Sequence, residues 1–124
     1  MSETIKIEDF IKVDLRVGQI LSVEKVPDTD KLLKLSVDLG PISKEGESDV
    51  KEGRDIRQIV SGIALYFPDI GVLVNKKCMF VANLEPRMIR GLESQGMILA
   101  VSTSDNKFSL LSPNDEIPAG TRAK

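Results

Sequence analysis

Apolar residues along the chain gather into short runs, and several runs alternate between apolar and polar side chains. The clearest alternation follows Lys31, where Leu33, Leu35, Val37 and Leu39 share one face of an extended segment. A period of two residues predicts a β-strand with one buried face. Similar runs predict five strands and a short edge strand, in the order 16–26, 31–40, 56–63, 78–84, 96–102 and 107–113.

Helical signals are weak and local. Residues 8–15 begin with two acids and predict a short helix or turn, and Pro68 and Gly71 limit residues 64–77 to a turn or two. Gly18 lies inside the first strand, where a bend around a small barrel would explain it. The pattern predicts an all-β protein: an OB-fold, a five-stranded Greek-key barrel, with short helical segments and N- and C-terminal extensions.

A chain of 124 residues fits one domain, which we take as residues 1–124. Residues 1–13 form an N-terminal arm with many apolar side chains, and residues 41–55 form a polar surface-loop insertion. The formal net charge is −2, but the insertion is acidic, whereas residues 76–90 carry four cations against Glu85 alone. A local positive face is therefore possible, although an indiscriminate nucleic-acid binder is disfavoured.

The composition argues against catalysis and metal binding. The chain has no histidine and one cysteine, so the usual zinc sites cannot be built and the commonest general base is absent. Ser61 and Ser94 have no plausible base nearby, which makes a small hydrolase remote. We expect no catalytic residue, metal or cofactor, an inert buried thiol at Cys78, no membrane partner and a cytoplasmic location.

The stretch "NLEPRMIRGLESQGMILAV", residues 83–101, combines features suited to recognition. Gly91 and Gly96 allow close approach of a backbone, and two arginines can contact phosphate. Its small polar side chains are donors and acceptors, but they could equally satisfy one another in a structural loop. From the residues alone, binding and structural roles are evenly matched.

Five segments in order resemble a known family: "IEDFIKVDLRVGQI", "PDTDKLLKLSVDLG", "RQIVSGIA", "VANLEPRMIRGLESQGMILA" and "LLSPNDEIPAG". They are similar to the tRNA-binding domain found at the C-terminus of many methionyl-tRNA synthetases, in free-standing structure-specific tRNA-binding proteins and in the endothelial-monocyte-activating polypeptide. The resemblance covers nearly the whole chain; residues 41–55 depart from it by their length. It implies noncatalytic binding of the folded L shape and phosphates of tRNA, as a C-terminal domain or β-type subunit that assists a synthetase catalytic domain. Aromatic stacking is expected to be a minor term.

The resemblance and the charge pattern together select ten candidate tRNA-binding residues. They are Lys31, Ser61, Gly62, Asn83, Arg87, Arg90, Ser94, Gln95, Gly96 and Met97. Lys31, Ser61, Gly62, Asn83, Ser94 and Met97 match family positions, whereas Arg87 and Arg90 are chosen for their charge. Met97 could instead be core filler, and Arg57 could add a phosphate contact or be an ordinary exposed strand arginine.

The resemblance further implies a homodimer, formed through residues 5–13 and roughly 110–119. The arm's apolar residues could instead pack on their own barrel. The alternative function is a homodimeric peptide-binding protein, because a secretion-chaperone family shares the barrel and the dimer. "GLESQGMIL" favours the tRNA-binding branch.

Overall fold

The computed structural model describes residues 3–42 and 53–124, and most of the regular secondary structure in them is β-strand. The described elements are α1 (Ile7–Phe10), β1 (Leu15–Lys25), β2 (Leu33–Pro41), β3 (Arg54–Ser61), the 3-10 turns η1 (Ala64–Tyr66) and η2 (Ile70–Leu73), β4 (Lys77–Val81), β5 (Arg87–Ile89), β6 (Leu92–Ser94), β7 (Met97–Ile98), β8 (Ala100–Ser102) and β9 (Phe108–Leu110). None of the helices in this part of the chain is long and apolar enough to cross a membrane.

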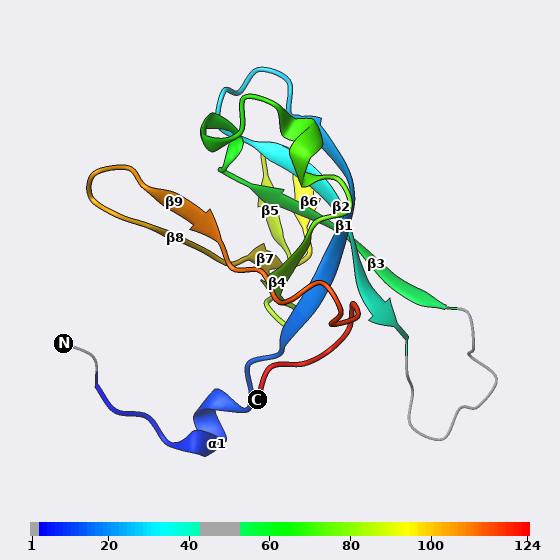
Figure 1. Cartoon of the computed structure of the whole chain (residues 1–124), viewed down its shortest axis with the longest axis vertical. Coiled ribbons are helices and arrows are strands. Elements are labelled where there is room, and N and C mark those ends of the chain that lie inside the picture. Colours follow the sequence, from blue (N-terminus) through cyan, green and yellow to red (C-terminus); the bar gives the residue numbers. More distant parts are fainter. Residues whose placement is uncertain (1–2, 43–52) are drawn as a thin grey trace.

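Five antiparallel strands form a curled sheet in the order β3-β2-β1-β4-β7 (Figure 1). The long β1 pairs with β2 from Gln19 onwards, and its first residues pair with β4, where Leu15 lies opposite Val81. The start of β1 does not pair with β2 and is instead covered along that edge by the C-terminal segment. There the Val17 amide donates to the Thr121 carbonyl at 2.9 Å. The curled sheet confirms the predicted all-β class with an OB-like fold.

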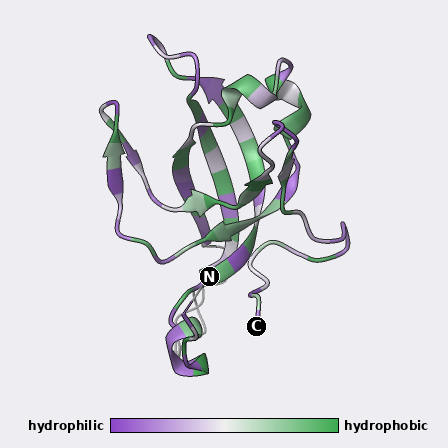
Figure 2. Cartoon of the chain, turned by 90° about the vertical axis from the view of Figure 1, so that its left-hand side faces the viewer, coloured by the Kyte–Doolittle hydropathy of each residue, from purple (hydrophilic) through white to green (hydrophobic). Residues whose placement is uncertain are grey.

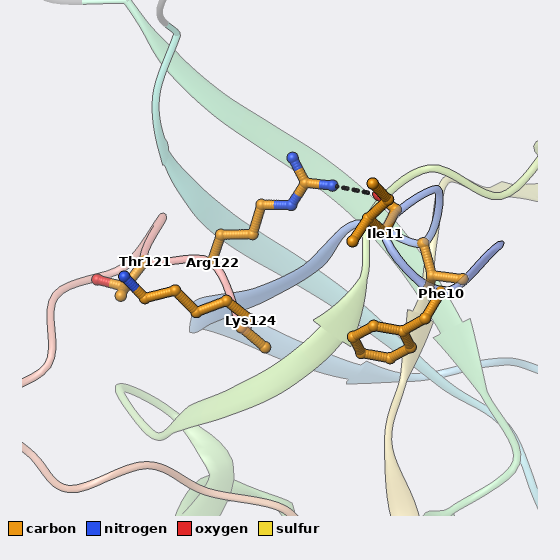
Figure 3. A pocket seen from close by; sticks show the side chains of 7 residues that line it. Phe10, Ile11, Thr121, Arg122 and Lys124 are labelled. Carbon is orange, nitrogen blue, oxygen red and sulfur yellow. Dashed lines mark hydrogen bonds between the residues drawn. The ribbon is translucent and has the colours of Figure 1, made fainter. Parts of the chain in front are cut away.

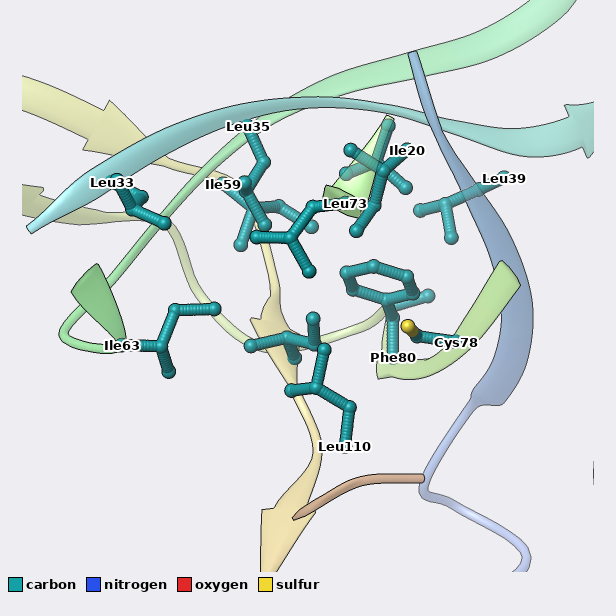
Figure 4. Packing of buried hydrophobic residues seen from close by; sticks show 13 residues of the cluster. Ile20, Leu33, Leu35, Leu39, Ile59, Ile63, Leu73, Cys78, Phe80 and Leu110 are labelled. Carbon is teal, nitrogen blue, oxygen red and sulfur yellow. The ribbon is translucent and has the colours of Figure 1, made fainter. Parts of the chain in front are cut away.

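The core fills the concave side of this sheet. The four alternating residues predicted on β2 are all fully buried and pack with Phe80 of β4 (Figure 4). Apolar and polar bands accordingly alternate along the strands (Figure 2). The site of Gly18 in β1 leaves no room for a side chain, because a Cβ there would lie 2.7 Å from side-chain atoms of Phe80 and Val37.

Three predicted segments differ in detail. The strand expected at 96–102 divides at Leu99, so that β7 stays in the main sheet while β8 leaves it to pair with β9. Within the 41–55 range, β2 extends to Pro41 and β3 begins at Arg54, and these two residues pair. Residues 43–52 of the predicted insertion lie outside the described residues. Both 3-10 turns fall where the sequence allowed only short helices.

Candidate nucleic-acid interface

A small hairpin that the sequence did not predict dominates the stretch from residue 83 to residue 96. Strands β5 and β6 pair so that Arg87 lies opposite Ser94, and Arg90 and Gly91 form the turn between them. Both turn residues have positive φ, 53° and 79°, as a two-residue type I′ turn requires. Gly91 therefore shapes the hairpin and places Arg90 at its exposed tip.

The segment after β6 closes the barrel against the free edge of β3. Two backbone amides of β3 donate to side chains rather than to a strand: Val60 N to Ser94 Oγ at 2.9 Å, and Gln58 N to Gln95 Oε1 at 3.0 Å. The Gln95 amide returns a bond to the Gln58 carbonyl at 2.8 Å. Ser94 is only 4% exposed. The polar atoms of Ser94 and Gln95 thus act as the missing strand partner of β3.

Asn83 is exposed, but its side chain hydrogen-bonds to backbone groups near the end of the N-terminal arm. Its Oδ1 accepts from the Asp14 amide at 2.9 Å, and its Nδ2 donates to the Lys12 carbonyl. These bonds join the chain just after β4 to the end of the N-terminal arm. Asn83 is therefore placed to orient the arm.

Arg57 belongs to an ion-pair network that crosses the open end of the barrel. Its guanidinium contacts Asp55 at 2.9 Å and donates to the Ala82 and Gln95 carbonyls. Arg16 lies 3.4 Å from the same Asp55 carboxylate. These contacts make Arg57 a structural residue that joins β3 to the chain after β4 and after β6. Its side chain is largely shielded from solvent.

Asp14 anchors the other end of this network. Its carboxylate accepts hydrogen bonds from Arg16, the shortest at 2.7 Å, and Arg122 of the C-terminal segment lies 3.5 Å away. The bonds from Arg16, more than any other influence, hold the pKa of Asp14 below its ordinary value, against an opposing effect of burial. The carboxylate stays ionised and ties β1 to the C-terminal segment.

The basic tip of the hairpin meets the loop between β1 and β2. Arg90 and Lys31 line one hollow together with Asp28, Thr29, Asp30 and Leu32. The Thr29 hydroxyl accepts from the amides of Lys31 and Leu32, which fixes the loop. Two cations from segments far apart in sequence thus converge on one part of the surface.

Ser61 and Gly62 adjoin this hollow. Ser61 pairs with Leu33 at the end of β3, and the Ala64 amide donates to the Lys31 carbonyl at 2.9 Å. Gly62 is exposed, whereas Ser61 is half-buried. The structure therefore brings Ser61 and Gly62 near the loop that carries Lys31, whereas the residues that line the hollow include Lys31 and Arg90 but neither Ser61 nor Gly62.

Arg87, Gly96 and Met97 lie towards the other end of the hairpin. Arg87 is exposed at the base of β5. Met97 is 45% exposed although the next residue, Ile98, is buried, so Met97 is not core filler. Gly96 passes close to β4, where a Cβ would lie 3.0 Å from the Val81 carbonyl oxygen.

Sequence reasoning missed one exposed residue of this region. Met88 projects from the middle of β5, and it is among the most exposed large apolar residues described. The only local signal was the glycine of "RG" between two short segments, because arginine in place of the usual asparagine or aspartate is not typical of a two-residue hairpin turn. Recognising the hairpin would have placed Met88 and Arg90 on it.

The sequence matches curated proteins over nearly the whole of this chain. A Methionine–tRNA ligase of Porphyromonas gingivalis is 41% identical over 125 residues; the match covers 100% of this chain and 16% of that relative. The chain thus spans a small part of the curated relatives that it matches, and only 15% of the Thermococcus onnurineus ligase.

Solved structures show the same fold. A MetRS related protein from Pyrococcus horikoshii superposes with a TM-score of 0.83 at 36% identity, over 99% of this chain and 100% of that one. A CsaA chaperone protein from Picrophilus torridus superposes with a TM-score of 0.76 at 27% identity, over 98% and 100% of the chains. The tRNA_bind family model, described as "Putative tRNA binding domain", matches residues 15–122. The chain belongs to this family of tRNA-binding domains.

Proposed function

We propose that the chain binds tRNA, without catalysing a reaction, on the face made by the β5–β6 hairpin and the loop at residues 27–32. The observation that carries this proposal is the convergence of Lys31 and Arg90 on one hollow. Folded RNA is recognised largely through phosphates and 2′-hydroxyls, and paired cations suit the phosphates. Asp28 and Asp30 line the same hollow and can accept hydrogen bonds from ribose hydroxyls.

The predicted site residues divide into two groups in this proposal. Lys31, Arg87, Arg90 and the exposed Met97 contact RNA, with Ser61 and Gly62 at the rim. Asn83, Ser94, Gln95 and Gly96 have structural roles in this proposal. Asn83 bonds to the backbone at the end of the N-terminal arm, Ser94 and Gln95 bond to β3, and Gly96 passes close to β4. Arg57 joins this second group as a brace.

A salt titration with the variant Arg87→Gln/Arg90→Asn tests the site. Asparagine tolerates the positive φ of position 90, so the turn is kept. Each lost phosphate contact should reduce the slope of log affinity against log salt by about 0.7–0.9, with weaker tRNA binding throughout. The variant Lys6→Gln/Lys34→Gln removes two cations that do not line this hollow and is the matched control. An unchanged slope in the hairpin variant would contradict the proposed site.

Peptide binding is the competing function, and the likeness to a CsaA chaperone supports testing it. Competition between tRNA, duplex RNA and an unfolded peptide separates the two. We expect tRNA to compete best, nearly independently of its anticodon, because shape and phosphates are read. Tight peptide capture with no tRNA binding would favour the alternative.

We further propose that two copies associate through the N-terminal arm. No residue of α1 is buried, and Ile7 is 67% exposed. Figure 3 shows Phe10 and Ile11 across from Arg122 and Lys124. These four residues and Val13 line an open hollow. Because the apolar side chains of the arm are exposed, they do not pack on their own barrel. The C-terminal residues that line this hollow beside the arm are 121–124, and the part expected of residues 110–119 in the interface between two copies stays a prediction.

Light scattering after size exclusion tests the dimer. Ile7→Glu places a charge in the exposed apolar patch and should shift the protein to monomers over a wide concentration range. Glu8→Gln on the same helix changes an exposed polar residue and should leave the mass unchanged. A monomeric parent protein would refute the association.

The chain is proposed to work in the cytoplasm as a C-terminal domain or β-type subunit of a methionyl-tRNA synthetase. Support comes from the ligase relatives, in which the matching region is a minor part of the whole. Addition of the chain to a synthetase catalytic domain that lacks it should lower the KM for tRNA with little change in kcat. No change in KM, whether the chain is fused or added separately, would contradict this role.

A further inference from the structure

The chain's one tyrosine is part of an aromatic stack away from the hairpin. Tyr66, at the end of η1, lies parallel to Phe108 of β9, with ring centroids 4.0 Å apart and an interplanar angle of 8°. Phe67 meets Phe108 edge-on, with centroids 5.8 Å apart. Both phenylalanines are half-buried, whereas Tyr66 is 41% exposed. Tyr66 is therefore the outer member of the stack.

The stack borders a hollow of about 410 Å³ whose remaining lining consists of polar and cationic residues and the apolar Leu110. Lys76 contributes an ammonium group, Asn106 an amide and Ser109 a hydroxyl. The residues described as lining it include no carboxylate, in contrast to the hollow at Lys31. A flat apolar ring beside a cation and small hydrogen-bonding groups matches the parts of a nucleotide: base, phosphate and sugar.

The aromatic hollow is continuous with the proposed tRNA-binding face. η1 follows directly on Ser61 and Gly62, and the amide of its first residue, Ala64, bonds to the Lys31 carbonyl. A further hollow lies between the two, lined by residues of the 25–32 region and by Ala64 and Phe67. RNA lying on Lys31 can therefore extend around the rim of the barrel to Tyr66.

We propose that this aromatic hollow holds an unpaired nucleotide of the bound RNA, with its base stacked on Tyr66 and its phosphate at Lys76. The inference rests on the proposed tRNA binding and adds to it a contact specific for single-stranded nucleotides. A paired base cannot use this contact, because its faces are covered by its neighbours in the helix. In this proposal, base stacking contributes more to RNA binding than the sequence predicted.

Nuclear magnetic resonance of tyrosine-labelled protein gives a direct readout, since the single tyrosine yields one set of ring signals. The probes are a short single-stranded RNA and a duplex of the same length. We expect the Tyr66 ring signals to move upfield with the single strand and to stay in place with the duplex. Labelling of the methionine methyl groups in the same protein adds signals from Met88 of the hairpin and from Met97. If these signals respond to RNA while Tyr66 does not, the stacking inference fails and the proposed function stands. If no residue responds to these probes or to tRNA, both fail.

Variants separate stacking from packing. Tyr66→Leu keeps an apolar contact on Phe108 and removes the π face, whereas Tyr66→Phe keeps the ring; thermal unfolding checks that both fold. The leucine variant should bind tRNA about 5- to 100-fold more weakly, and the phenylalanine variant within about 2-fold of the parent. Lys76→Gln should lower the salt slope by about 0.7. Parent-like tRNA affinity in folded Tyr66→Leu would overturn the inference.

Discussion

Replacement of Ser94 by alanine removes one oxygen from the seam between β3 and the end of β6. That oxygen accepts a hydrogen bond from the Val60 backbone amide at 2.9 Å and lies 3.2 Å from the Gly96 carbonyl oxygen. Ser94 is almost entirely buried. Alanine fits the same space, so the main consequence is a buried amide without a partner. Such a group costs about 1–3 kcal/mol, and we expect a loss near 2 kcal/mol.

For a chain of this size, a loss of about 2 kcal/mol lowers Tm by roughly 8 °C, which far-ultraviolet circular dichroism can measure. The salt slope of tRNA binding should be unchanged below the transition, because no charge is removed. Ser102→Ala, at an exposed position of β8, is the matched control and should stay within about 0.5 kcal/mol of the parent. An unaltered Tm together with weakened tRNA binding would refute the structural role and make Ser94 an RNA contact.

Three further predictions concern stability and reactivity. Gly40→Ala should destabilise the fold by more than about 1 kcal/mol in urea unfolding, because φ is 97° and the new Cβ would meet the C-terminal backbone at 2.5 Å; Gly62→Ala, in open space, should not. In the unfolded chain Asp14 is protonated near pH 3.8, whereas in the folded chain the bonds from Arg16 keep its pKa lower. The ionised carboxylate therefore stabilises the fold above pH 3.8, and this stabilisation is lost as the pH falls through the folded pKa. Asp14→Asn should therefore flatten the acid limb of stability in urea titrations from about pH 6 to pH 2, and an unchanged limb would contradict the ion-pair account. Burial raises the pKa of the Cys78 thiol, so a disulfide reagent at about pH 8 should react slowly with folded protein and quickly in urea; rapid reaction of the folded protein would show that the thiol is accessible.

The sequence determined the class of the fold and most of its strands. Alternation along Leu33, Leu35, Val37 and Leu39 is a local property, and a strand with one buried face is its simplest physical outcome. The charge of Lys31 is also a local property, and it predicted a surface position because an ammonium group is rarely buried. Lys31 is exposed in the structure. The resemblance to a family supplied the rest of the functional prediction.

Only the tertiary structure decided which small polar residues face solvent. Serine, asparagine and glutamine can be satisfied by water, by RNA or by buried backbone, so their identity does not reveal their partner. Ser94 bonds to Val60, 34 residues away, and Asn83 to Asp14, 69 residues away. Such partners are set by how the sheet curls and which edge stays unpaired. Periodicity and charge act within a segment, but closure of the barrel depends on segments that meet only after folding.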